Sequence, residues 1–168
     1  MTDNITLINI TSSMRDTASE KSKKMGVLRH SIAKGKGNMY GFLGEGLFKQ
    51  YASPFYKVET HNTYDYDFLV NGDIRIDVKT KSTGVRPLSY YDCSVAEYNT
   101  KQKCDVYVFT RILYSLKKLW IVGWLPKQEY FNESTFLKKG SLDEDNGYEV
   151  KASCYNLKIN KLNLMENL

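Results

Sequence analysis

Residues 64–81, Tyr-Asp-Tyr-Asp-Phe-Leu-Val-Asn-Gly-Asp-Ile-Arg-Ile-Asp-Val-Lys-Thr-Lys, decide the fold class of this chain. The dipeptide Asn71-Gly72 separates two β-rich runs, which is the strongest short-range signal for a β-hairpin. In the second run a period of two separates the side chains into two faces, Ile74, Ile76 and Val78 on one and Arg75, Asp77 and Lys79 on the other. The stretch therefore predicts two antiparallel strands, with an acid and an amine side by side on one face.

The length of the hairpin loop decides which face Asp67 occupies. A two-residue loop pairs Asp67 with Ile76 and puts Asp67 and Asp77 on opposite faces. A three-residue loop, 71–73, pairs Asp67 with Asp77 and gives the two carboxylates a common face. A shared site therefore requires the wider loop or a bulge near Asp67, and a register shift of two residues would make Asp65 the alternative ligand.

Two carboxylates and a lysine on adjacent strands are the groups that a divalent metal ion and a phosphate need. Mg²⁺ and Mn²⁺ prefer oxygen ligands and usually take one or two protein carboxylates, with water and substrate phosphate in the remaining positions. Asp67 and Asp77 fit this role, and Lys79 could orient a water molecule or stabilise charge on the transferring phosphoryl group. An ordinary surface hairpin with an Asp–Lys pair on its exposed face is the alternative.

Together with Glu45, which lies in an expected helix over residues 39–51, these residues resemble the PD-(D/E)xK nucleases. The resemblance implies an α/β domain of the restriction-endonuclease-like fold, with a mixed central β-sheet flanked by helices. It implies that Glu45, Asp67 and Asp77 bind the metal and that Lys79 is the catalytic lysine. The chain departs from the family pattern in two places, because Tyr66 stands where a proline is frequent and the second acid is Asp instead of Glu.

The resemblance also implies the reaction and its setting. We expect a Mg²⁺- or Mn²⁺-dependent deoxyribonuclease, an endonuclease that acts as a homodimer if it cuts both strands with one active site per chain. The abundance of Lys, Asn and Tyr indicates an AT-rich genome, and the compact build resembles phage-encoded nucleases, which act in the host cytoplasm. The alternative from another class is a nucleic-acid-binding protein that keeps the fold without catalysis.

The positive charge of the chain is concentrated near the N-terminus. The chain has 24 Lys and Arg against 19 Asp and Glu, a formal charge of +5, and residues 14–38 hold seven basic residues against two acidic ones. We interpret this helical segment either as a solvated helix face or as a phosphate-binding patch, in which Lys34 and Lys36 approach the nucleic-acid backbone. Lys81, Arg86 and Gln102 are the other expected nucleic-acid contacts.

Composition and length argue against several other classes of protein. The 168 residues predict one domain, 1–168, with 42% hydrophobic content, which is enough for a core. Only two histidines are present, which argues against zinc hydrolases. No apolar run approaches membrane-spanning length and no signal-peptide pattern is present, so we expect a soluble, intracellular protein with reduced cysteines.

The remainder of the chain predicts further strands and short helices. The glycines beside Glu45, Gly44 and Gly46, suggest close approach of the helix to the hairpin or to substrate. Two apolar strands, 105–113 and 118–125, complete the sheet, and we interpret Trp120 and Trp124 as core residues on one face. The remaining expected elements are a strand over 56–61, a short strand over 89–94, helices over 95–103 and 126–131, a strand or extended segment over 148–157 and a tail over 158–168.

Overall fold

A six-stranded mixed sheet is the centre of the structure, a computed structural model that describes residues 5–25 and 36–168. The strands of this sheet lie in the order β1-β7-β6-β4-β3-β2. The elements are, in chain order, β1 (Thr6–Asn9), α1 (Ser12–Met25), α2 (Lys36–Ala52), β2 (Val58–Thr60), β3 (Phe68–Val70), β4 (Ile74–Thr83), β5 (Asp92–Ala96), the 3₁₀ helix η1 (Glu97–Lys101), β6 (Val106–Leu113), β7 (Lys118–Pro126), α3 (Lys127–Glu133), β8 (Thr135–Leu137), β9 (Leu142–Asp143), β10 (Tyr148–Glu149), β11 (Cys154–Lys158), η2 (Ile159–Lys161) and η3 (Met165–Asn167).

The hairpin of β3 and β4 has the wider of the two loops considered above. Val70 pairs with Ile74, so residues 71–73 form the loop. Asn71 and Gly72 both have positive φ, 52° and 83°, which is the conformation that this dipeptide favours. The three-residue alternative is therefore confirmed.

The sheet is mixed because one of its pairings is parallel. β4 runs parallel to β6, from Ile76 opposite Val106 to Thr83 opposite Leu113, whereas every other pairing in this sheet is antiparallel. A parallel pair needs a crossover connection, and here β5 and η1 supply it. The predicted α/β class with a mixed central sheet is thus confirmed.

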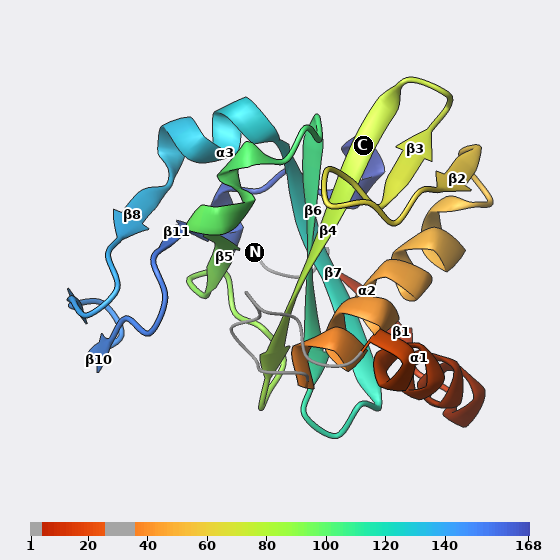
Figure 1. Cartoon of the computed structure of the whole chain (residues 1–168), viewed down its shortest axis with the longest axis horizontal. Helices are drawn as coiled ribbons and strands as arrows, with labels where there is room; N and C mark the ends of the chain where they lie inside the picture. The colour runs from red at the N-terminus through yellow and green to blue at the C-terminus, as the bar shows by residue number, and fades with distance from the viewer. Residues whose placement is uncertain (1–4, 26–35) are drawn as a thin grey trace.

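Each face of the central sheet carries its own hydrophobic core. Figure 1 shows α1 and α2 on one face, and the small sheet β5-β11-β8 with α3 on the other. The first core is built by α2 and inward residues of the sheet such as Phe48, Ile76 and Val108. The second contains Tyr107, Phe109 and Tyr130. β4 therefore has a helical layer on one side and the small sheet on the other.

The prediction that Trp120 and Trp124 share one face is wrong. The pairing of β6 with β7 shifts register between Phe109 and Thr110, so that Gly123 and Ile121 oppose consecutive residues. This bulge reverses the alternation of side chains along the strand. Trp120 consequently lies in the core under the small sheet, whereas Trp124 packs against the core under the helices.

Three other parts of the chain differ from the sequence prediction. Residues 95–103 do not form the expected helix, because Val95 and Ala96 end β5 and only Glu97–Lys101 are helical, as a 3₁₀ turn. The predicted strand 148–157 is divided between β10 and β11. The predicted tail packs against the protein, since Met165 is buried and Trp124 Nε1 donates to Leu164 O (3.0 Å). None of the helices in the described part of the chain is long and apolar enough to cross a membrane.

Candidate active site

Asp67 is held against β4 by its backbone and its side chain. It immediately precedes β3, where its N–H donates to Ile76 O (2.9 Å). Its carboxylate Oδ2 accepts from the backbone N–H of Val78 (2.8 Å). Val78 stands between Asp77 and Lys79, so the hairpin brings all three predicted polar groups of the two strands together.

Asp77 and Lys79 form the predicted pair on the face of β4 that carries the small sheet. Asp77 is only 3% exposed, and its Oδ2 lies 2.6 Å from Lys79 Nζ. Apart from this ion pair, Oδ2 accepts no hydrogen bond from the described residues. A cation that binds Oδ2 would therefore have to displace the ammonium of Lys79 or share the oxygen with it.

Gln102 connects the pair to the loop before β3. Its Nε2 donates to Asp77 Oδ1 (2.9 Å) and to Tyr64 O (2.7 Å), and its Oε1 accepts from Lys79 Nζ (3.0 Å). The side chain is 4% exposed. Gln102, expected on the nucleic-acid surface, therefore lies inside the site and orients both members of the pair.

Glu45 enters the site from α2, and a glycine sets the distance of that helix from the sheet. A Cβ on Gly44 would lie 1.9 Å from Thr80 Oγ1, so α2 can approach β4 this closely only with glycine there. A Cβ on Gly46 would meet nothing within 4 Å. The predicted close approach of the helix to the hairpin is confirmed for Gly44, whereas Gly46 does not approach the hairpin and its approach to substrate stays a prediction.

The three carboxyl groups interact electrostatically. Burial, followed by the charge of Asp77, raises the pKa of Glu45 from 4.5 to about 7, against the opposing effect of Lys21 and Lys79. Burial, then the charges of Asp77 and Glu45, raise the pKa of Asp67 well above its usual range. Burial also raises the pKa of Asp77, although Lys79 and Gln102 oppose that shift. The site therefore concentrates more negative charge than Lys79 can offset.

This set of donors fits a hard divalent cation, for which one or two of the carboxylates would be ligands. The described residues contain no group of three or more His, Cys, Asp or Glu side chains arranged to hold a metal ion. Mg²⁺ does not require such a group, since it usually binds one or two carboxylates and completes its shell with water and phosphate. The Oδ2 atom of Asp77, now in contact with Lys79, and the neighbouring Asp67 carboxylate are oxygen donors of this kind, and the charge of Glu45 acts on Asp67 as well.

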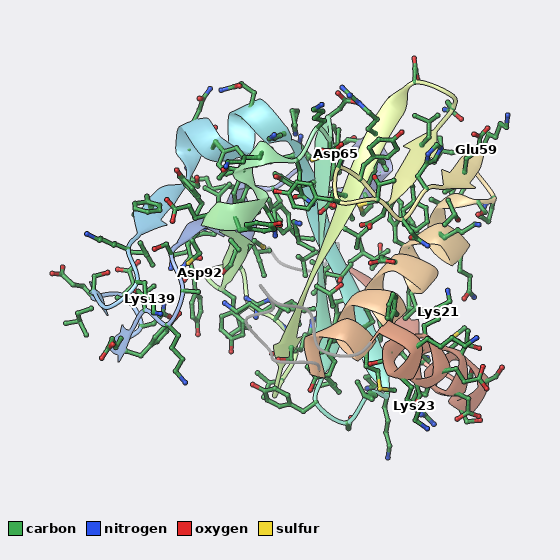
Figure 2. The ribbon with its side chains drawn as sticks, in the orientation of Figure 1. Lys21, Lys23, Glu59, Asp65, Asp92 and Lys139 are labelled. Atoms are coloured by element: carbon green, nitrogen blue, oxygen red, sulfur yellow. The ribbon has the colours of Figure 1, made fainter. Side chains whose placement is uncertain are left out.

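The other predicted site residues are distributed around this centre. Asp65, the alternative ligand, accepts from the backbone N–H of Lys103 (3.0 Å) and lies on the loop before β3 (Figure 2). Lys81 follows Lys79 on β4, and Arg86 is exposed in the loop that follows this strand. Lys36 is the first residue of α2, whereas Lys34 lies outside the described residues.

Sequence reasoning missed the supports of the site. The ring centroid of Tyr107 lies 5.5 Å from Lys79 Nζ, and Tyr107 opposes Asp77 in the parallel β4–β6 pairing. Lys21 of the basic segment acts on Glu45 across the α1–α2 contact. Predicting the role of Tyr107 requires the pairing of β4 with β6, and predicting that of Lys21 requires the packing of α1 on α2. Local sequence patterns supply neither.

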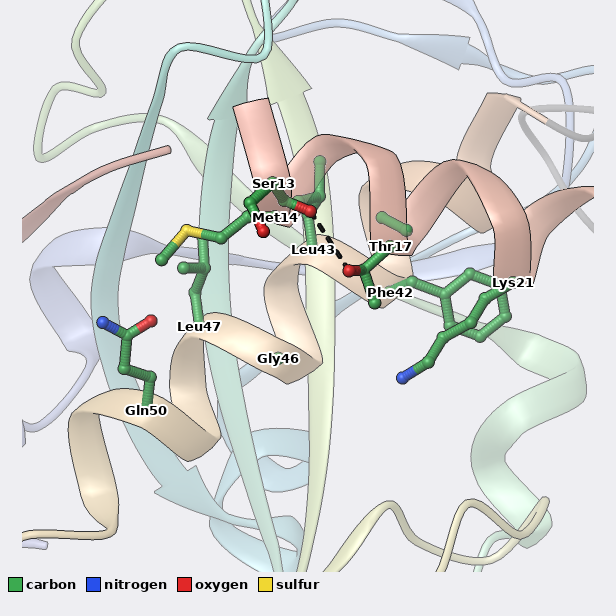
Figure 3. A pocket seen from close by; sticks show the side chains of 10 residues that line it. Ser13, Met14, Thr17, Lys21, Phe42, Leu43, Gly46, Leu47 and Gln50 are labelled. Atoms are coloured by element: carbon green, nitrogen blue, oxygen red, sulfur yellow. Dashed lines mark hydrogen bonds between the residues drawn. The ribbon is translucent and has the colours of Figure 1, made fainter. Parts of the chain in front are cut away.

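A cavity of about 200 Å³ lies beside the site and is separate from it. It opens between α1 and α2, with Met14, Phe42 and Leu47 in its lining and Lys21 at one end (Figure 3). No carboxylate lines it. The chemistry described above therefore lies outside this cavity, at the start of β3 and the middle of β4.

Comparison of the sequence with known families and curated proteins adds no relative to these observations. No protein-family model matches the sequence, and no curated protein matches it significantly.

Proposed function

We propose that this protein is a Mg²⁺- or Mn²⁺-dependent nuclease that hydrolyses phosphodiester bonds of DNA. The observation that carries the proposal is the contact of Asp77 with Lys79 beside Asp67, with Glu45 close enough for its charge to raise the pKa of Asp67. The order of elements supports it further. A helix with Glu45 precedes the strand entered by Asp67, and the next strand carries Asp77-Val78-Lys79, as in the PD-(D/E)xK nucleases.

Each residue has a distinct role in this proposal. Asp67 and Asp77 would hold the metal ion, with Glu45 as the third acid, and the bound ion would lower the pKa of water and offset charge on the phosphate. Lys79 lies on the same face as Asp77 and would orient the attacking water or stabilise negative charge that develops on the phosphate. Gln102 would keep Asp77 and Lys79 in position through its amide group.

Endonuclease activity on DNA, with a homodimer for cleavage of both strands, is the specific form that we propose. We also propose that the central sheet belongs to the restriction-endonuclease-like fold, because the helix with Glu45, the strand entered by Asp67 and the strand with Asp77 and Lys79 follow one another in a mixed sheet. A phage-encoded enzyme acting in the host cytoplasm is consistent with the composition of the chain.

A non-catalytic nucleic-acid-binding protein is the second candidate. The observation that favours it is the closed ion pair between Lys79 and Asp77, since an ammonium group at 2.6 Å occupies the side of Oδ2 that a metal would use. In a nuclease this contact must open or rearrange when metal binds. In a binding protein it would remain closed.

One experiment separates the two candidates. Supercoiled plasmid is incubated with protein and Mg²⁺ or Mn²⁺, with an EDTA control and with Asp77→Asn, which removes ligand charge at nearly constant shape. We expect nicked or linear product for wild type only, and only with metal. Equal cleavage by a folded Asp77→Asn protein would refute the proposed site, and DNA binding without any cleavage would favour the second candidate.

A further inference from the structure

Two cations lie side by side just beyond Asp77 and Lys79, at the position two residues further along β4. Lys81 follows Lys79 by two residues and so occupies the same face of β4. In the parallel pairing Lys81 opposes Arg111 of β6, which is 6% exposed. Two like charges are thus placed side by side between the central sheet and the small sheet.

No carboxylate pairs with either cation among the described residues. Arg111 donates to the backbone oxygens of Ser82 and Asp92, and its guanidinium lies 5.7 Å from the ring centroid of Tyr91. The carboxylate of Asp92 forms its ion pair with Lys158 (2.9 Å), although its charge also acts on Lys81 and Arg111 from a greater distance. A nearly buried guanidinium with only neutral acceptors retains a positive charge that an external anion would offset.

The ammonium group of Lys81 is placed where such an anion would bind. Its Nζ lies 3.3 Å from Ser94 Oγ, whose hydroxyl donates to Asn156 Oδ1 (2.6 Å). The residue is exposed, although partial desolvation, followed by the charge of Arg111, lowers its pKa. An ammonium on the surface with a second cation directly behind it is an arrangement that attracts phosphate.

We propose that Lys81, positioned by Ser94 and with Arg111 behind it, forms a second phosphate subsite for the DNA strand whose neighbouring phosphate reacts at Asp77 and Lys79. This inference rests on the proposed function. Two residues along a strand advance about 6.6 Å, a distance comparable to the separation of successive phosphates in an extended nucleic-acid strand. Lys81 contacts the phosphate directly, and Arg111 strengthens the subsite through its charge.

The test measures the affinity for a short DNA duplex in EDTA as a function of salt concentration. Lys81→Gln should reduce the slope of log affinity against log salt by about 0.9, the value for one lost phosphate contact. Lys81→Arg should retain the wild-type slope. Lys139→Gln is the matched control, because Lys139 is an exposed lysine at the far end of the small sheet (Figure 2). A wild-type slope in Lys81→Gln would overturn the subsite.

A second measurement uses only the wild-type protein. Lysine acetylation is followed by mass spectrometry with and without the duplex, again in EDTA. DNA should slow acetylation of Lys81 and leave Lys139 unaffected, and equal rates at Lys81 would contradict the proposal. Because neither measurement needs cleavage, a protein that protects Lys81 but never cuts DNA would refute the nuclease and retain the subsite. DNA cleavage by wild type, without any effect of the substitution or of DNA at Lys81, would support the nuclease and refute the subsite.

Discussion

Gly44 of α2 and Thr80 of β4 are in direct contact, and a Cβ on Gly44 would stand 1.9 Å from Thr80 Oγ1. The Thr80 hydroxyl is not free to move aside, because it accepts a hydrogen bond from Thr110 Oγ1 (2.8 Å). This contact fixes the position of the helix that carries Glu45.

The first prediction concerns this contact. Gly44→Ala should lower the free energy of unfolding by about 1–3 kcal/mol, as overpacking does in other cores. Gly46→Ala is the matched control, two residues further along the helix with open space around its Cβ, and should raise stability by about 0.5–1 kcal/mol. Urea denaturation measures both. Similar effects of the two substitutions would mean that α2 is not held against β4 as described.

The second prediction concerns pH and Glu45. Its pKa is raised from 4.5 to about 7, so between these pH values the folded state holds a proton that the unfolded state has lost. Stability therefore falls as pH rises through this window, by about 3 kcal/mol for a shift of this size. In EDTA, the urea midpoint of wild type should decrease from pH 5 to pH 8 more than that of Glu45→Gln. Parallel pH profiles for the two proteins would show that Glu45 is not in the buried, charged environment described.

The third prediction concerns metal binding. Millimolar Mn²⁺ should raise the melting temperature of wild type, because an ion that binds only the folded state stabilises it by mass action. The increase should be smaller in Glu45→Gln and absent in Asp77→Asn. Ca²⁺-free buffer with matched ionic strength, adjusted with NaCl, is the control for screening. No shift in wild type, with or without DNA, would contradict the metal site.

The fourth prediction concerns Lys79, whose ammonium neutralises Asp77. Lys79→Ala should retain or strengthen metal binding, because it removes a competing cation, and should reduce turnover by a factor on the order of a hundred. Lys118→Ala, an exposed lysine at the start of β7, should have wild-type turnover. Loss of metal binding together with activity would assign Lys79 a structural role.

The fifth prediction concerns Gln102. Gln102→Leu leaves buried groups of Asp77 and Tyr64 without their donor and should lower stability by about 1–3 kcal/mol. It should also reduce the rate of cleavage at saturating DNA while leaving DNA affinity in EDTA unchanged. Gln128→Leu, on the exposed surface of α3, is the control. A fall in DNA affinity with an unchanged rate would support the nucleic-acid contact that the sequence predicted for Gln102.

Local patterns were sufficient for the hairpin and for the pairing of an acid with an amine on β4. The alternation along β4 depends only on the period of a strand, and the structure confirms it for Ile76 and Val78, which both lie in the core under the helices, whereas Ile74 is exposed. The common face of Asp67 and Asp77 depended on loop length, and both alternatives were compatible with the dipeptide Asn71-Gly72. The observed register decided between them.

The features that were missed depend on contacts between distant parts of the chain. The reversal of faces between Trp120 and Trp124 results from a bulge in the pairing of β6 with β7, which the even spacing of the two residues conceals. In the sequence, Arg111 is one polar residue in an otherwise apolar strand. Its position opposite Lys81 follows from the parallel pairing of β4 with β6, which the sequence alone does not predict. The small sheet is likewise assembled from short segments far apart in sequence.

The raised pKa values at Glu45, Asp67 and Asp77 have a consequence for how this protein would evolve. Selection for thermal stability alone, without metal, should enrich amides or apolar residues at these positions, since each ionised acid destabilises its neighbours. Selection for nuclease activity should retain all three acids. A library sorted separately for stability and for activity would therefore diverge at these positions, and the direction of that divergence would identify the carboxylates as functional.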